Sequence, residues 1–107
     1  VLLPLAFPIT QDGMLIGQIE YVDRFGNLVT NITAANVREW SETAGRPHPE
    51  VHVGTCIIQG LVISYSQGGL DSPSALINSS GKLEIFVDQQ SAARHLQIGV
   101  GAEVRLC

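Results

Sequence analysis

The sequence has few charged residues, and few basic ones in particular. Charged side chains make up 15% of its 107 residues, against roughly 25% in typical soluble domains. Only 6 residues are Lys or Arg, against 10 Asp or Glu, which gives a net charge of −4. Such a chain has no electrostatic attraction to a phosphate backbone or to an anionic lipid surface. The composition therefore argues against nucleic-acid binding and against a polybasic membrane anchor.

Long apolar runs are also missing. No stretch approaches the roughly 18 apolar residues that a membrane-spanning helix needs. The apolar opening at residues 1–5 is interrupted by Pro4 and has no basic flank, unlike a signal peptide. We therefore expect a soluble protein with no membrane partner.

Cysteine is scarce, since Cys56 and Cys107 are the only two. Neither lies at a metal-binding spacing. One disulfide between them is one interpretation, and two reduced thiols are the other. The second is favoured for a protein of the reducing cytosol, so we expect a cytoplasmic location.

Side chains for metal or nucleophilic chemistry are scattered along the chain. None of the three histidines has a cysteine or carboxylate at metal-ligand spacing. No GxSxG turn or comparable signature supports a Ser/His/Asp triad. The residues alone predict no metal, no cofactor and no complete catalytic set. The histidines are His48, His52 and His95.

The sequence does contain a succession of short strand patterns. Alternating or β-branched residues predict strands near residues 14–23, 28–32, 51–53, 55–65, 75–78, 82–88 and 103–106. Thr33 and Ser91 are suitable N-caps for short helices over residues 34–40 and 92–96. We therefore predict an all-β fold: a small, closed or nearly closed antiparallel Greek-key barrel of about seven strands with one or two short helices.

Glycine and proline mark the expected interruptions. Gly17 predicts a bulge or bend in the first strand. Residues 24–27 and 79–81 have the composition of tight hairpin turns. Loops are expected over residues 41–49 and 66–73, where Gly, Pro and Ser gather.

Two turn segments are polar although the neighbouring strands are apolar, at residues 23–27 and 78–81. An Asp can hold an ammonium group, a Ser-Ser-Gly turn can hold a carboxylate, and an Asn side chain can pair with an adenine edge. Two interpretations stay open. The segments form a ligand site, or Gly26, Asn27 and Gly81 only supply turn geometry.

Two separated motifs resemble one enzyme family. The string GQIEYVDRFGNLVTNI at residues 17–32 is followed by INSSGKLEIFV at residues 77–87 and by QSAARHL. Together they resemble the C-terminal domain of the S-adenosyl-L-methionine (SAM) hydroxide adenosyltransferases, the SAM hydrolases related to fluorinase and chlorinase. The motifs DRFGNxxTN and NSxG occur in the order that this family has, which makes the resemblance specific.

The resemblance implies a two-domain enzyme. A larger N-terminal α/β domain, absent from this chain, would carry the Asp/Arg/His set that activates water. Residues 13–107 would be the C-terminal β-barrel domain, and residues 1–12 the remnant of an interdomain linker. The active site would form between this domain and the N-terminal domain of a neighbouring subunit in a homotrimer. The resemblance thus places no catalytic residue in this chain.

Site roles also follow from the resemblance. Asp23 and Ser79 would hold the methionine amino and carboxylate groups, with Ser80 where the halogenating relatives have Arg. Phe25 would pack against the ligand, and Asn27 would bond the adenine edge.

Three further residues would complete the site by the same resemblance. Backbone groups near Val87 and Gln89 would bind adenine, and Tyr65 would form an aromatic wall.

The chain departs from the fluorinase pattern in ways that favour water as the nucleophile. It has no proline between Arg24 and Phe25, and it has Val29 in place of a Trp and Ser80 in place of an Arg. The implied reaction is attack of water or hydroxide at the ribose C5′, which yields adenosine and L-methionine.

Two alternatives differ in class. The first is a non-catalytic module that binds an adenosyl ligand or trimerises its parent. The second is an OB-like nucleic-acid binder, which the negative charge disfavours and which would need aromatic residues interleaved with Lys or Arg. Phe86 lies instead between Ile85 and Val87, and Trp40 is expected to cap the barrel.

Overall fold

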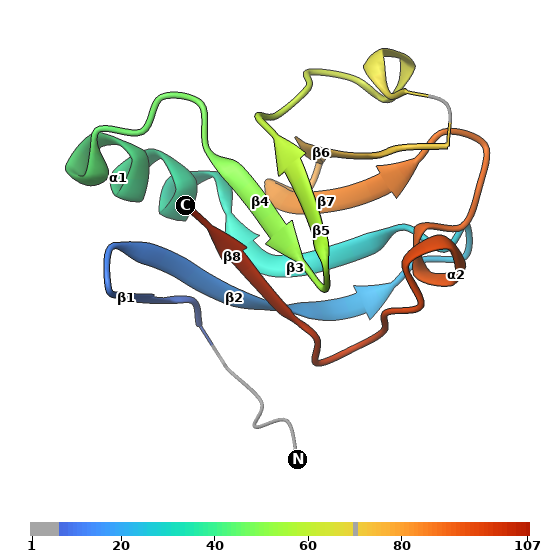
Figure 1. The fold of residues 1–107 in the computed structure, drawn as a ribbon, viewed down its shortest axis with the longest axis horizontal. Helices are drawn as coiled ribbons and strands as arrows, with labels where there is room; N and C mark the ends of the chain where they lie inside the picture. Colours follow the sequence, from blue (N-terminus) through green and yellow to red (C-terminus); the bar gives the residue numbers. More distant parts are fainter. Residues whose placement is uncertain (1–6, 70) are drawn as a thin grey trace.

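In the computed structural model, which describes residues 7–69 and 71–107, the longest strand is β2 (Met14–Val22). Its first half pairs with β1 (Ile9–Gln11) on one side and β8 (Glu103–Leu106) on the other. Its second half pairs with β3 (Leu28–Thr33). β2 therefore joins two parts of one curved sheet (Figure 1).

The sheet wraps into a nearly closed barrel. Its order is β5-β4-β8-β2-β3-β7-β6, with β1 as an additional partner of β2, and the pairs are antiparallel. The two ends of this order are linked by the segment after β5, where the Val62 N–H donates to the Ala75 carbonyl of β6 at 2.8 Å. The predicted barrel with short helices is confirmed. The remaining strands are β4 (Glu50–Val53), β5 (Cys56–Gln59), β6 (Pro73–Ile77) and β7 (Lys82–Val87).

The barrel interior is filled by aliphatic side chains. Burying one such side chain contributes about 1.5–3 kcal/mol relative to leaving it exposed. The predicted strand at residues 51–53 is present as part of β4, and the alternation of Val51 and Val53 places both inside the barrel. The other large, fully buried side chains include Ile19, Leu28, Ile32, Leu83, Ile85, Val104 and Leu106.

Gly17 has a different role from the predicted bulge. It pairs regularly with Val104, and the register shift of β2 lies further along, between Ile19 and Tyr21. A Cβ at Gly17 would lie 2.5 Å from the Ile32 side chain. The position therefore requires glycine because the next strand crosses it closely.

The first helix, α1 (Ala34–Ala44), is longer than the sequence predicts. Thr33 caps it as expected, with its hydroxyl accepting from the Asn36 N–H at 3.1 Å. The helix continues past Trp40 because no breaker occurs before Gly45, which adopts a left-handed φ of 67°. The predicted loop therefore begins four residues later than residue 41.

Trp40 of α1 packs into the hydrophobic core. Its side chain is buried, and its indole N–H donates to the Gly13 carbonyl at 3.0 Å. The second helix, α2 (Ala92–Leu96), also begins at its predicted cap, where the Ser91 hydroxyl accepts from the Arg94 N–H.

The predicted strand over residues 55–65 is wrong beyond Gln59. β5 ends there because Gly60 adopts a φ of 73°, which extended strands do not allow. The chain then turns into a short 3₁₀ helix, η1 (Tyr65–Gln67). The Gln67 side chain holds this turn by accepting from the Ile63 N–H at 2.7 Å.

The sheet begins before residue 13. β1, within the segment assigned above to a linker, forms a hairpin with β2. Residues 1–6 of that segment lie outside the described residues. Both cysteines are free, and burial raises the pKa of the Cys56 thiol. No helix in the described part of the chain has the length and apolar character needed to cross a membrane.

Candidate functional site

The turn between β2 and β3 is organised by the Asp23 side chain. Its Oδ1 accepts hydrogen bonds from the backbone N–H groups of Phe25 and Asn27, both at 2.9 Å. Gly26 adopts the left-handed φ of 85° that the turn requires, and its N–H donates to the Asp23 carbonyl. This geometry leaves the Phe25 ring 64% exposed at the tip of the turn.

The turn between β6 and β7 repeats this arrangement. Asn78 Oδ1 accepts from the N–H groups of Ser80 at 3.0 Å and Lys82 at 3.1 Å. Gly81, at φ 78°, donates to the Asn78 carbonyl. Both segments are thus the tight turns that the sequence predicts, and Ser79 and Ser80 are exposed on the second.

Glu84 connects the two turns, and the sequence analysis missed it. The residue is 3% exposed, in the middle of β7. Its Oε2 accepts from Asn27 Nδ2 at 3.2 Å, and its Oε1 accepts from Asn78 Nδ2 at 3.0 Å. A third donor, the Tyr65 hydroxyl, lies 2.8 Å from Oε2.

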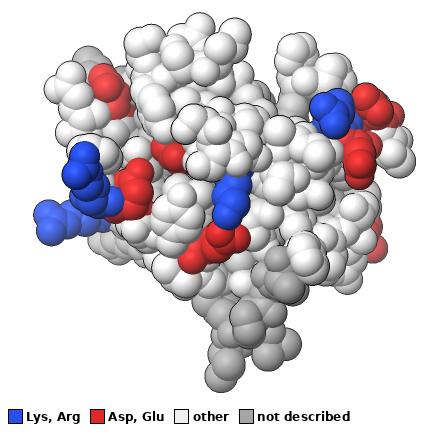
Figure 2. Space-filling model, turned by 180° about the vertical axis from the view of Figure 1, so that it is seen from behind, with Lys and Arg blue, Asp and Glu red and all other residues white. Residues whose placement is uncertain are grey.

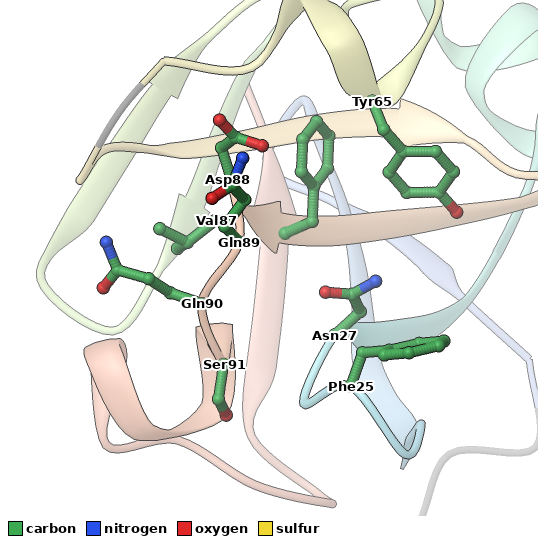
Figure 3. A pocket seen from close by; sticks show the side chains of 9 residues that line it. Phe25, Asn27, Tyr65, Val87, Asp88, Gln89, Gln90 and Ser91 are labelled. Atoms are coloured by element: carbon green, nitrogen blue, oxygen red, sulfur yellow. The ribbon is translucent and has the colours of Figure 1, made fainter.

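A pocket of about 380 Å³ opens between the first of these turns and the segment that follows β7. Figure 3 shows Phe25 and Asn27 on one side, with Val87, Gln89 and Ser91 across from them. Five of the residues that the sequence analysis proposed for the site line it. The complete lining is Phe25, Asn27, Tyr65, Phe86, Val87, Asp88, Gln89, Gln90 and Ser91.

Aromatic rings form part of the pocket wall. Tyr65 and Phe86 pack edge to face with ring centroids 5.0 Å apart. Burial, followed by the hydrogen bond to Glu84, raises the pKa of Tyr65 to about 12. Tyr65 is placed here by η1 rather than by the predicted strand, and its ring is still 49% exposed.

The opposite wall is a backbone turn. The Gln90 N–H donates to the Val87 carbonyl at 3.1 Å and closes a turn whose four residues, 87–90, line the pocket. Gln89 adopts a φ of 56°, and its side chain is exposed. The wall is tied to the first turn, because the Ala93 N–H of α2 donates to the Gly26 carbonyl at 2.9 Å.

Three proposed site residues do not line this pocket. Asp23 lies at the base of the first turn, and Ser79 and Ser80 lie on the second. Asp23 accepts from the Asn27 backbone, and Asn78, which accepts from the Ser80 N–H, shares Glu84 with the Asn27 side chain. Next to the serines, Lys82 forms an ion pair with Glu20, which raises the pKa of Lys82.

Other parts of the described chain carry less chemistry. No group of three or more His, Cys, Asp or Glu side chains is placed to hold a metal. His52 instead pairs with Glu50 at 3.1 Å. On the face seen in Figure 2, basic residues lie beside acidic ones and form no continuous basic surface. A hollow of about 500 Å³ between α1 and the β1–β2 hairpin contains none of the motif residues.

A family comparison agrees with the motifs. The model of the SAM hydroxide adenosyltransferase C-terminal domain matches residues 17–105, from the middle of β2 into β8. The chain therefore belongs to this family.

Solved structures share the fold. An uncharacterized conserved protein from Thermotoga maritima has a TM-score of 0.74 and 24% identity, covering 98% of this chain and 40% of that one. A conserved hypothetical protein from Thermus thermophilus has a TM-score of 0.65 and 27% identity, covering 96% and 36%. This chain thus spans less than half the length of either protein. No curated protein matches it.

Proposed function

We propose that this chain is the substrate-binding C-terminal domain of an enzyme that hydrolyses SAM to adenosine and L-methionine. The single observation that carries the proposal is that Phe25 and Asn27 of the DRFGN motif line a pocket in a chain that belongs to this family. The alternative reading of Gly26 and Asn27 as turn residues alone does not explain why Asn27 and Phe25 face this space.

The pocket suits the adenine end of the substrate. Its volume of about 380 Å³ is within the range of small-molecule sites. The exposed faces of Phe25 and Tyr65 offer apolar contact to a purine, and the Asn27 amide offers a hydrogen bond to its edge. The backbone between Val87 and Gln90 supplies further polar groups. Because the proposal uses only backbone groups there, the side chains of Val87 and Gln89 should matter little.

The amino-acid end of SAM would extend toward the two turns. Asp23 Oδ1 is already used by two backbone N–H groups, so the methionine ammonium binds through the other carboxylate oxygen. Ser79 and Ser80 carry exposed hydroxyls that can bind the methionine carboxylate. The Ser80 N–H is not available for this, because it donates to Asn78.

Catalysis would use this domain for positioning. A sulfonium leaving group departs neutral, so displacement at C5′ needs little acid catalysis and depends on alignment and exclusion of water. Phe25 and Tyr65 are too exposed in this chain to exclude water. We therefore assign the second wall, and the groups that activate water, to the N-terminal domain of a neighbouring subunit in a homotrimer.

Water, and not a halide, is the proposed nucleophile. The argument rests on the turn itself, which reads RFGN without an inserted proline, and on Ser80. In the halogenating relatives an Arg stands at the latter position.

The test is to incubate SAM with the full-length protein and with this chain alone, and to separate the products by chromatography. We expect adenosine and L-methionine from the full-length protein only. SAM that binds without product formation would support the non-catalytic binding module instead. Product from the isolated chain would contradict the assignment of catalysis to another domain.

A further inference from the structure

Glu84 is the only charged side chain that is buried among the described residues. Every hydrogen-bonding partner it has there is a donor: the Asn27 amide, the Tyr65 hydroxyl and the Asn78 amide. A buried carboxylate is costly unless such donors satisfy it. Its position behind the pocket wall therefore needs an explanation beyond packing.

The consequence for Asn27 is a fixed orientation. Because Nδ2 donates to Glu84 Oε2 at 3.2 Å, the amide oxygen must face away from Glu84. Figure 3 shows this oxygen on the side of Val87 and Gln89, toward the pocket. A flipped amide would bring its oxygen against the carboxylate, where two acceptors repel.

We propose that Glu84 is a positioning residue that holds the Asn27 oxygen toward the pocket and so selects a ligand with a hydrogen-bond donor there. The proposal rests on the proposed function, because it takes the pocket as the site of the purine. On the purine edge that carries N7 and the position-6 group, a 6-aminopurine presents an N–H donor at position 6, whereas a 6-oxopurine presents an acceptor there. The site should therefore prefer adenosine to inosine.

The expected preference for adenosine over inosine follows from two hydrogen-bond acceptors that would be left without a donor. With inosine, the Asn27 oxygen and the purine O6 would face each other without a hydrogen. Leaving a buried polar group unpaired weakens binding by about tenfold or more. We expect the full-length protein to bind adenosine about tenfold or more tightly than inosine, with both affinities measured by titration calorimetry.

The substitution Glu84→Gln tests the role of the carboxylate. The amide of Asn78 cannot rotate, because its oxygen accepts from Ser80 and Lys82. The new glutamine must therefore keep its oxygen toward Asn78 and turn its NH₂ toward Asn27. The Asn27 amide then rotates to accept this bond and presents its own NH₂ to the pocket.

The predicted result is a change in selectivity. In Glu84→Gln, adenosine should bind about tenfold more weakly, and inosine should bind as well as before or better. Tyr65→Phe is the matched control, because it removes another donor from Glu84 and leaves the Asn27 contact in place. Because Tyr65 also lines the pocket, the comparison uses the ratio of the two affinities, which should stay at its wild-type value.

The outcomes separate the two proposals. An equal loss for both nucleosides in Glu84→Gln would show a structural role only and would overturn the positioning proposal. Wild-type protein that hydrolyses SAM yet binds both nucleosides equally would also overturn it, whether or not the variant folds. Wild-type protein that neither binds adenosine nor hydrolyses SAM would overturn the proposed function as well.

Discussion

At the scale of single residues, Gly26 and Gly81 allow a matched comparison. They occupy the same position in the two equivalent turns, with φ of 85° and 78°. A Cβ at Gly26 would lie 2.8 Å from the Ser91 Cα, whereas a Cβ at Gly81 would meet nothing within 4 Å. The turns thus share their backbone strain and differ in their surroundings.

We expect Gly81→Ala to lower the free energy of unfolding by about 1–2 kcal/mol, the cost of a left-handed alanine. Gly26→Ala should lower the free energy of unfolding by about 1–3 kcal/mol more than Gly81→Ala does, because the added methyl group also forces α2 away from the turn. Urea denaturation of the two variants measures the difference. Equal losses would mean that the contact between this turn and Ser91 is not tight in solution.

Tyr65 makes the free energy of unfolding depend on pH in alkaline solution. Burial and Glu84 raise its pKa from the ordinary value of 10.0 to about 12. The folded state therefore keeps a proton that the unfolded state loses above pH 10. The stabilising effect is complete below pH 10 and is lost as the pH rises to about 12.

The wild-type free energy of unfolding should thus fall more steeply between pH 10 and about 12 than that of Tyr65→Phe. Denaturation at a series of pH values measures both slopes. Thr43→Ala, at an exposed position of α1, leaves the contact between Tyr65 and Glu84 in place and should keep the steep wild-type slope. Parallel slopes for wild type and Tyr65→Phe would contradict the raised pKa.

At the scale of elements, α1 depends on its N-terminal cap. The Thr33 hydroxyl accepts from Asn36 N–H, and the Asn36 side chain returns a bond to the Thr33 N–H at 2.9 Å. Thr33→Ala should cost about 1 kcal/mol of unfolding free energy. Urea denaturation measures it, and Thr43→Ala in the exposed last turn of the helix should cost nothing, since alanine favours helix. Equal effects would show that the cap is not formed.

Strands could be predicted from the sequence where one face of the strand is buried. Functional side chains were missed where both faces of the strand are buried. The alternation of residues 82–88 puts Leu83, Ile85 and Val87 on one face of the strand, and all three are buried in the core. The same alternation leaves Glu84 on the opposite face, which in an antiparallel sheet is commonly exposed to solvent. β7 lies between β3 and β6, and Tyr65, Asn27 and Asn78 cover its second face. No local pattern contains those contacts.

At the scale of the whole molecule, the pocket combines segments that are distant in sequence. The β2–β3 turn, η1 and the segment after β7 each contribute side chains. The motifs identified Phe25 and Asn27 from the sequence, whereas Tyr65 reaches the pocket through a 3₁₀ turn that the strand prediction did not contain. Closure of the barrel brings them together, and this closure depends on long-range pairing that no single segment encodes.

Asp23 serves the fold and, by our proposal, the ligand, and the second turn shows how to separate these roles. Asn78 organises an equivalent turn with an amide oxygen. Asp23→Asn should therefore preserve the turn and its unfolding free energy while removing the negative charge. Because a charge-assisted hydrogen bond is lost, SAM binding to the full-length protein should weaken by about 1–3 kcal/mol in calorimetry.

Adenosine provides the matched ligand, because it lacks the amino group that Asp23 is proposed to hold. Its affinity should be the same in wild type and in Asp23→Asn, since the first turn and the Asn27 amide stay in place. Weaker binding of both ligands would show that the substitution disturbs the pocket itself. Unchanged binding of SAM would show that Asp23 is a turn residue alone, and the ammonium would then have to be bound by a group outside this turn.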